Sequence, residues 1–251
     1  RYPGKPLAKL KMPNGSHKSL IQMSYETACE VNGIDSVYVA TDDNRIKEAA
    51  RTFGAEVIMT SKHCRNGTER CSDAQSCAGL KADLFINLQG DAPLTPPWFI
   101  EELIIAMQTD ENVDMATPVV QLNYETYNHF VRDRKNNRVG GTTAVFNNSK
   151  HALYFSKELL PFLDLRNFAA SQNIPAYHHV GVYAYRPNIL RDYKYWPEGR
   201  LEQLEGLEQL RFLENGHKIK CVEVDSRGRA FWELNNPEDI AVIEAALRQF
   251  T

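Results

Sequence analysis

The first half of the chain alternates short apolar segments with longer amphipathic ones. The apolar segments VYVAT, AEVIMTS, LFINLQ and VDMATPVVQ occupy residues 37–41, 55–61, 84–89 and 113–121. The amphipathic segments lie at 42–54, 68–80 and 96–108, and Gly54 and Pro96 mark helix ends. Apolar strands joined by helices of this length are typical of βαβ units. The pattern predicts an α/β, Rossmann-like fold whose mixed, mostly parallel sheet is flanked by helices.

The second half is richer in strands. A loop is expected around residues 162–177, and a single helix is predicted over LEQLEGLEQLRFLENG (201–216), closed by Gly216. The predicted strands are GTTAVFNN and ALYFS, which should pair, then HHVGVYAYR (178–186) and IKCVEV (219–224). A C-terminal helix is predicted over residues 236–250. We expect a single domain over residues 1–251, with an inserted β-rich part at about 122–200.

Composition places the chain among ordinary globular proteins. Hydrophobic residues make up 43% of its 251 positions, and the formal net charge is -3. That charge argues against binding to nucleic acid or to an anionic membrane surface. The sequence has no apolar run long enough to span a bilayer and no signal-peptide pattern, so a cytoplasmic location is expected. The five cysteines lack zinc-site spacing, and we expect reduced thiols.

Polar residues follow three of the predicted strands directly. They are Thr41-Asp42-Asp43, the NGTER segment at 66–70, and Gln89-Gly90-Asp91. Ligands of open parallel sheets bind beyond the carboxyl ends of the strands. A fourth segment, RYPGKPL at residues 1–7, offers Gly4 for close backbone approach and basic side chains suited to a polyphosphate. Each segment alone is also compatible with turn or helix-cap chemistry. Their shared sheet edge therefore carries the prediction of a ligand site.

Together these segments resemble the 3-deoxy-manno-octulosonate (Kdo) cytidylyltransferases, a family of sugar-acid cytidylyltransferases. The matching stretches are RYPGKPLA, YVATDDNRI, NGTER, NLQGDAP, ALYFSK, HHVGVYAY, LEGLEQLRFLENGHKI and NNPEDI. They occur in family order and span essentially the whole chain. The resemblance implies transfer of CMP from CTP to a sugar acid with release of pyrophosphate, a Mg²⁺ requirement, and a homodimer. It also implies an apolar strand and a basic loop ahead of RYPGKPL.

The resemblance assigns roles to individual residues. Lys5 and Asp91 are the expected catalytic residues, and Asp91 would be a Mg²⁺ ligand. The other nucleotide contacts would be Arg1 at the triphosphate, Thr68 and Arg70 at the cytosine end, and Gln89. The acceptor contacts would be Lys157, His179, Glu208 and Gln209. His178 and His179 face opposite sides of a strand and make a poor chelate for one metal, and the resemblance favours His179 as the site residue.

Departures from the family pattern collect on the acceptor side. Asn235 stands where the family carries the second carboxylate ligand of Mg²⁺, and Glu233 could substitute for it if residues 231–235 are extended. Lys157 replaces an arginine and loses the bidentate fork that suits a carboxylate. His178 replaces another arginine, Ala92 replaces a glutamate, and TTAV at 142–145 lacks a lysine.

These departures leave alternatives open. One is a CTP-dependent pyrophosphorylase that joins CMP to a phosphorylated small molecule and yields a CDP-linked product. The other is a nucleotide-binding homologue that lost catalysis together with the second carboxylate. The survival of Lys5, Asp91 and the NGTER segment favours an active enzyme that uses CTP and a small-molecule acceptor.

Overall fold

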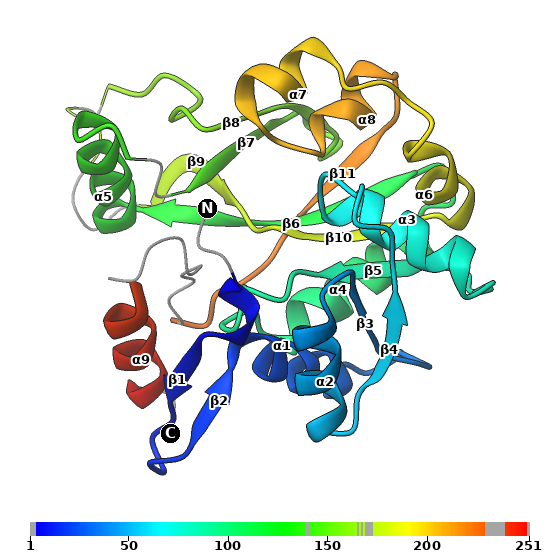
Figure 1. Cartoon of the computed structure of the whole chain (residues 1–251). Coiled ribbons are helices and arrows are strands. Elements are labelled where there is room, and N and C mark those ends of the chain that lie inside the picture. Colours follow the sequence, from blue (N-terminus) through cyan, green and yellow to red (C-terminus); the bar gives the residue numbers. More distant parts are fainter. Residues whose placement is uncertain are drawn as a thin grey trace.

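The structure is a computed structural model that describes residues 4–138, 141–164, 166, 168, 173–228 and 239–249. Its centre is a seven-stranded sheet wrapped by helices (Figure 1). The strands run in the order β5 (Phe85–Leu88), β10 (Val182–Tyr185), β6 (Met115–Asn123), β9 (Asn173–His179), β7 (Thr142–Phe146) and β8 (Ala152–Ser156), and β11 (Ile219–Glu223) pairs with β6. Two strand pairs lie apart from this sheet: β1 (Lys9–Lys11) with β2 (His17–Ser19), and β3 (Tyr38–Thr41) with β4 (Glu56–Met59).

The predicted mixed α/β fold is confirmed, and the pairing pattern refines it. β3 with β4 and β6 with β11 are parallel pairs. The other described strand pairs are antiparallel, so the prediction of a mostly parallel sheet is wrong. In the central sheet this is largely because β9 and β10 from the second half interleave with strands of the first half. β5 and β6 therefore do not pair directly; both flank β10.

β9 and β10 form one long strand with an interruption. Both pair with the same edge of β6, and β11 takes the other edge. On the side away from β6, β10 pairs with β5 and β9 pairs with β7. The sheet thus forks at Val180-Gly181, where the interrupted strand changes its outer partner from β7 to β5 while β6 stays paired with it. The prediction of one continuous strand from 178, preceded by a loop, was wrong at both points: the strand begins at Asn173 and breaks at Val180.

Alternation along β10 shows how the sheet is buried on both faces. Tyr183 and Tyr185 belong to a core formed with α6, α8 and β8, and Val182 and Ala184 belong to a core formed with α4. Successive strand residues point to opposite faces, so each face of β10 has its own apolar partner. All four residues are buried. β10 is therefore a central strand, and its position fixes Val180-Gly181 before it and the start of the helix at Pro187 after it.

The helices cover both faces of the sheet, with α6, α7 and α8 on one side and α4 on the other (Figure 1). Their bounds are α1 (Leu20–Cys29), α2 (Asn44–Thr52), α3 (Gly67–Cys77), α4 (Pro97–Thr109), α5 (Tyr124–Lys135), α6 (Pro187–Tyr193), α7 (Arg200–Glu205), α8 (Leu210–Glu214) and α9 (Asp239–Gln249), with a short 3₁₀ turn η1 (Lys5–Leu7). Within the described ranges no helix is both long and apolar enough to cross a membrane.

The single helix predicted over 201–216 is wrong. Helix α7 ends at Glu205 because Gly206 takes a left-handed conformation, with φ of 63°, and a new helix starts at Leu210. The leucine spacing continues through the break, although Leu204 is 73% exposed and Leu210 is fully buried. The break releases residues 207–209 from helical geometry. Two predicted acceptor contacts, Glu208 and Gln209, lie in that released segment.

Candidate active site

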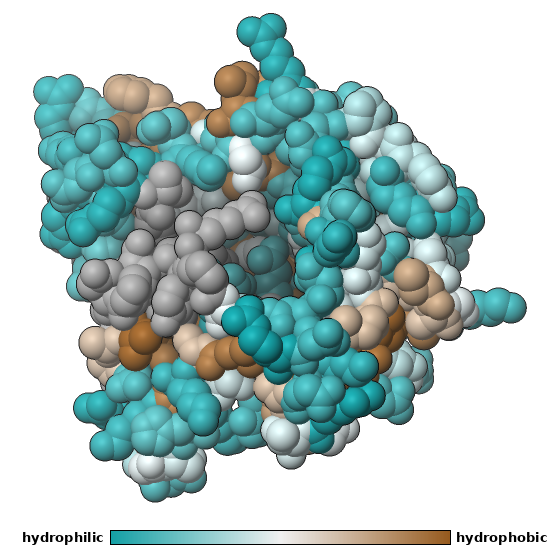
Figure 2. Space-filling model, in the orientation of Figure 1, coloured by the Kyte–Doolittle hydropathy of each residue, from teal (hydrophilic) through white to brown (hydrophobic). Residues whose placement is uncertain are grey.

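A cavity of about 740 Å³ opens at the fork of the sheet. Its walls come from the start of α3, the segment after β5, the start of β7, the β9–β10 junction, and α7 with the turn that follows it. Figure 2 shows a hollow near the centre of this face of the molecule, with hydrophilic side chains along much of its rim. These five parts of the chain, together with Lys157 after β8, thus meet where β5 and β7 diverge. This position agrees with the predicted ligand site beyond the end of the LFINL strand. The single sheet edge predicted for all the polar segments is wrong, because β3 and β4, which precede two of them, form a separate strand pair.

Lys5 and Asp91 form an ion pair outside the cavity lining, although Gln89 and Ala92, on either side of Asp91, line the cavity. Lys5 Nζ lies 2.7 Å from Asp91 Oδ2, and the two side chains are 18% and 27% exposed. Lys5 stands at the start of η1 because Gly4, with φ of 73°, turns the chain sharply before it. Asp91 follows β5 and Gly90, where a side chain would collide with Ile21 of α1. Two motifs far apart in the sequence therefore present one cation and one carboxylate together, still partly open to solvent.

The NGTER segment forms the first turn of α3. Asn66 caps the helix by accepting a hydrogen bond from the backbone N–H of Glu69, at 2.9 Å. The Thr68 hydroxyl is fully buried and lies 2.7 Å from the Tyr185 hydroxyl. The Thr68 backbone N–H donates to Glu208 Oε2 at 3.0 Å. Thr68 is therefore buried behind the cavity wall, where its backbone holds Glu208, and its predicted contact with the cytosine end stays a prediction.

Glu208, Gln89 and Gly67 converge at one wall of the cavity. Gln89 Nε2 donates to Glu208 Oε1 at 3.2 Å. A side chain on Gly67 would lie 3.0 Å from Asn87 Nδ2 and 3.5 Å from Glu208 Oε1, so only glycine leaves this junction room. Burial raises the pKa of Glu208 to about 7, against backbone hydrogen bonds from Thr68 and Gly67 that lower the pKa. A carboxyl that titrates near neutrality thus faces the cavity.

His178 and His179 both line the cavity as neutral imidazoles. Burial lowers the pKa of His178 to about 4 and that of His179 to about 3. His179 Nε2 lies 2.9 Å from the Thr117 hydroxyl, and its ring packs against Phe155 and Tyr183. His178 packs edge-on against Phe130. The predicted acceptor contact His179 is therefore a fixed, uncharged hydrogen-bonding group.

Lys157 and Gln209 supply hydrogen-bond donors to the cavity wall near the end of β8 and the turn after α7. Lys157 follows β8, and its backbone N–H donates to Glu205 Oε2 at 2.9 Å. Its Nζ reaches the open face of Gly206, where an added Cβ would lie 3.0 Å away. Gln209 is 1% exposed; its Oε1 accepts from Tyr183 at 3.2 Å, and its Nε2 has no hydrogen-bond partner among the described residues. A buried amide donor without a partner is suited to a ligand oxygen.

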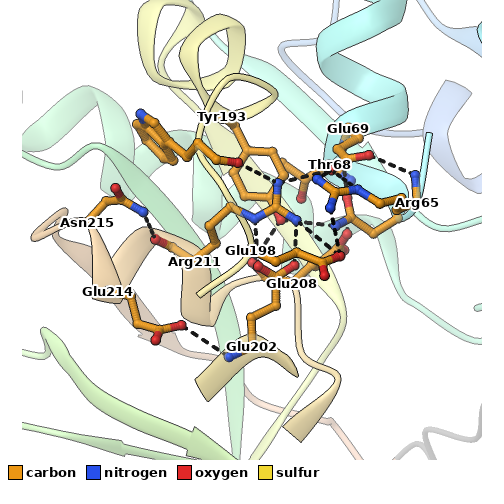
Figure 3. Close-up of polar contacts among 12 residues, drawn as sticks. Arg65, Thr68, Glu69, Tyr193, Glu198, Glu202, Glu208, Arg211, Glu214 and Asn215 are labelled. Carbon is orange, nitrogen blue, oxygen red and sulfur yellow. Dashed lines mark hydrogen bonds and ion pairs between the residues drawn. The ribbon is translucent and has the colours of Figure 1, made fainter. Parts of the chain in front are cut away.

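A buried network of charges lies behind this wall, as Figure 3 shows. Arg211 is fully buried; its Nε and Nη2 contact the two oxygens of Glu202 at 2.6 Å each, and its Nη1 contacts Glu69 at 3.0 Å. Its guanidinium also lies 4.2 Å from the centre of the Tyr193 ring. The Tyr193 hydroxyl donates to the backbone oxygen of Glu208 at 3.0 Å. The network thus ties α3, α6, α7 and α8 together around Glu208.

The other predicted residues are placed less centrally. Arg70 directs its guanidinium to Thr60 at 2.7 Å and Asp42 at 2.9 Å, near the ends of β3 and β4, and is not in the cavity wall. Arg1, Asn235 and Glu233 lie outside the described residues. Among the described residues, no three His, Cys, Asp or Glu side chains lie together in a way that could hold a metal ion. The roles predicted for these residues stay predictions.

Sequence reasoning missed four charged residues of the site. Arg65, Glu198 and Glu202 line the cavity, and Arg211 orders its wall. Arg65 pairs with Glu69 and, at 3.0 Å, with Glu198. Glu202 and Arg211 lie in the segment predicted as one helix over 201–216, and its leucine spacing did not indicate that these two residues form a buried pair. The LEQLR motif itself was the available signal, because it places an arginine between apolar residues.

The family of the chain follows from comparison with known proteins. A family model described as cytidylyltransferase matches residues 1–219. The chain belongs to the cytidylyltransferase family. It is accordingly a nucleotidyltransferase, as its sequence predicted.

Relatives of this cytidylyltransferase match over nearly their whole length. The 3-deoxy-manno-octulosonate cytidylyltransferase of Maricaulis maris is 41% identical over 247 residues, covering 98% of this chain and 92% of the relative. The 8-amino-3,8-dideoxy-manno-octulosonate cytidylyltransferase of Shewanella loihica is 44% identical over 252 residues, with coverage of 98% and 93%. The predicted resemblance to the Kdo cytidylyltransferases is thereby confirmed.

Solved structures agree with this assignment. A CMP:2-keto-3-deoxy-manno-octonic acid synthetase complexed with CTP superposes with a TM-score of 0.81 at 33% identity, covering 100% of this chain and 94% of that one. A 4-diphosphocytidyl-2C-methyl-D-erythritol synthase from Anaerococcus prevotii matches with a TM-score of 0.57 at 12% identity, which shows a shared fold alone. The cytidylyltransferase fold of this chain is therefore seen both in its own structure and in a CTP-bound relative.

Proposed function

We propose that this cytidylyltransferase transfers CMP from CTP to a Kdo-type sugar acid and releases pyrophosphate. The observation that carries the proposal is one cavity lined by Gln89 and Ala92, which stand on either side of Asp91 in the sequence, and by Lys157, His179 and Gln209. We assign the first group, with the Lys5–Asp91 ion pair next to it in the chain, to the nucleotide and the second group to the acceptor. The acceptor hydroxyl attacks the α-phosphorus, so nucleotide and acceptor must be bound at once and held in line. Gln89 links the two sides, since it precedes Asp91 by two residues and donates to Glu208.

The chain's own residues fit the requirements of this reaction. Lys5 supplies positive charge where the triphosphate is expected, and Lys157 supplies it where the acceptor carboxylate is expected. His179 and Gln209 offer neutral hydrogen bonds to hydroxyl groups, and the burial of His179 keeps it uncharged, with a pKa lowered to about 3. The wall of β10 and α8 behind them is apolar and tightly packed. Such a wall excludes water from the acceptor side, which favours transfer to the sugar over hydrolysis of CTP.

The described residues fit Mg²⁺ bound mainly through the substrate. Mg²⁺ takes one or two carboxylates together with phosphate oxygens and water. Asp91 offers one partly exposed carboxylate, and phosphates could take over the ammonium group of Lys5 that pairs with it. We propose Asp91 as the Mg²⁺ ligand, with Asn235 or Glu233 as the candidate second ligand. A bound Mg²⁺ would neutralise charge that develops on the phosphates.

The acceptor and the assembly are also proposed. Relatives that act on Kdo and on its 8-amino analogue match this chain about equally, so both sugars are candidate acceptors. Two of the cavity's carboxylates, Glu198 and Glu208, could accept hydrogen bonds from either sugar. The second half of the chain stays the predicted dimerisation region.

A pyrophosphate-release assay tests the proposal. CTP and Mg²⁺ are offered with Kdo, with 8-amino-3,8-dideoxy-Kdo, or with a phosphorylated polyol, and pyrophosphate is measured by a coupled assay. We expect turnover with at least one of the two sugar acids. Turnover with the phosphorylated acceptor alone would establish the pyrophosphorylase instead. Binding of CTP without turnover on any acceptor would establish a non-catalytic homologue.

A further inference from the structure

Glu208 differs from the other carboxylates around the cavity in its partners. Arg211 contacts Glu202 and Glu69, and Arg65 contacts Glu69 and Glu198. Of the four carboxylates Glu69, Glu198, Glu202 and Glu208, the first three therefore form ion pairs with these two arginines. The contacts of the Glu208 carboxylate within the described residues come from neutral donors, the Thr68 backbone N–H and the Gln89 amide.

The position of Glu208 places it between the two halves of the reaction. Its Oε1 accepts from Gln89, two residues before Asp91, and its segment continues into Gln209, which faces the acceptor side. Two or three hydrogen bonds leave at least one lone-pair direction of a carboxylate open. A hydroxyl bound in the cavity can use that direction. One side chain, that of Gln89, thus separates the Glu208 carboxylate from the segment that carries Asp91, and the next residue, Gln209, lines the proposed acceptor side.

We propose that Glu208 is the general base that removes the proton from the acceptor hydroxyl as this hydroxyl attacks CTP. The proposal rests on the proposed transfer of CMP to a sugar acid. The O–P bond to the α-phosphorus forms, the bond from the α-phosphorus to the bridging oxygen breaks, and pyrophosphate leaves with that electron pair. The hydroxyl proton passes to Glu208 and from there to solvent. No oxidant, reductant or further reactant is needed.

The surroundings of Glu208 suit this role. Ionisable groups face it from each element packed against it: Cys71 on α3, Tyr185 on β10, Tyr193 on α6 and Glu202 on α7. Burial raises the pKa of Cys71 to about 12 and raises the pKa values of both tyrosines, so these three are neutral at pH 7. Glu202 opposes a second negative charge. Together with burial, this holds the pKa of Glu208 at about 7. A base is most effective when its pKa lies near the working pH.

The rate of the chemical step should depend on the protonation of Glu208. Below its pKa, Glu208 carries a proton and cannot accept another, so the rate of the chemical step should fall as the pH falls through about 7. Single-turnover rates, measured with saturating CTP, Mg²⁺ and Kdo between pH 5.5 and 9, report that step. We expect an acid limb in the wild-type protein. A rate that stays flat over this range would overturn the proposal without any variant.

Glu208→Gln is the sharper test because its amide oxygen can still accept from Thr68. We expect the single-turnover rate to fall by about 10²- to 10⁴-fold and the acid limb to disappear. CTP binding, measured by calorimetry, should stay within a few-fold of wild type. A variant that keeps a near-normal rate and only raises the KM of the acceptor would overturn the proposal, since Glu208 would then merely bind the sugar.

Glu198→Gln is the matched control. Glu198 lines the same cavity, is 32% exposed and pairs with Arg65, so its loss should leave the acid limb in place. Loss of the limb in Glu198→Gln would assign the titration to the outer carboxylate and overturn the proposal. Wild-type turnover is measured first. Absence of turnover with both sugar acids refutes the proposed function, whereas turnover that survives in Glu208→Gln with its limb intact refutes the general base alone.

Discussion

Replacing Arg211 by methionine should destabilise the protein more than almost any other single change. Arg211 is fully buried, and its loss removes both contacts to Glu202, whose side chain is 7% exposed. Glu69 keeps Arg65, so Glu202 becomes the carboxylate left without a cation. Breaking a buried ion pair from one side costs about 3–5 kcal/mol. Since a domain of ordinary stability has about 5–15 kcal/mol in total, the loss is a large share.

Urea unfolding followed by tryptophan fluorescence measures the effect. Trp196 packs edge-on against Phe212, and its backbone oxygen contacts Arg211, so its signal reports on this region. We expect the free energy of unfolding to fall by about 3–5 kcal/mol at pH 7 with an unchanged m-value. The double variant Arg211→Met/Glu202→Gln removes both charges and should recover about 1–3 kcal/mol of that loss.

The control is Arg51→Met, which removes an arginine from an exposed pair with Glu48. Those side chains are 58% and 66% exposed, and the expected change stays within about 0.5 kcal/mol. A loss below about 1 kcal/mol in Arg211→Met would show that Glu202 finds solvent or another partner. Simple additivity in the double variant would show that the two residues are not coupled. Either result would refute the network as the support of the cavity wall.

Three further predictions concern the site. In the pyrophosphate assay, Asp91→Ala should lower turnover at least a thousandfold and abolish the dependence of turnover on Mg²⁺ concentration. The control Asp83→Ala, at an exposed position, should leave both turnover and its Mg²⁺ dependence unchanged. Lys157→Met should raise the KM of the sugar acid about 10- to 100-fold with little change in the KM of CTP, and Lys157→Arg should bind the sugar at least as well as wild type. The pKa of His179 is lowered to about 3, so its imidazole should stay neutral and its NMR signals constant from pH 8 to pH 5; a titration midpoint near 6.5 would contradict its burial.

Local pattern was enough to predict the elements whose signal is itself local. The strand LFINLQ, the helix after Pro96 and the paired strands β7 and β8 lie where alternation and capping placed them. The single domain with its β-rich insertion stays a prediction. The order of strands was beyond this reasoning. Nothing near residues 84–89 indicates that their partner is β10, because pairing between distant strands depends on the packing of both faces.

The helix break at Gly206 shows why part of the site was missed. A leucine every third residue favours one helix, and an isolated glycine costs a helix only about 1 kcal/mol. The buried pair between Arg211 and Glu202, the capping of α3 by Glu208 and the contact between Tyr193 and Glu208 together outweigh that local preference. The resemblance to the Kdo cytidylyltransferases named Glu208 and Gln209 as candidates. Their delivery to the cavity required tertiary contacts that no local pattern carries.

The interrupted strand β9–β10, which pairs with β5, β6 and β7, also constrains how the protein folds. Among the described strands, β5 has β10 as its only partner, and β10 is synthesised long after it. As the ribosome extends the chain, Asp91 therefore has no completed sheet beneath it until residue 185 has emerged. Such distant pairings slow folding, since a long loop must close before any contact offsets its entropy. The same interleaving makes the part of the chain that carries β5 and the part that carries β10 depend on each other for strand pairing, so we expect neither part to fold when it is expressed alone.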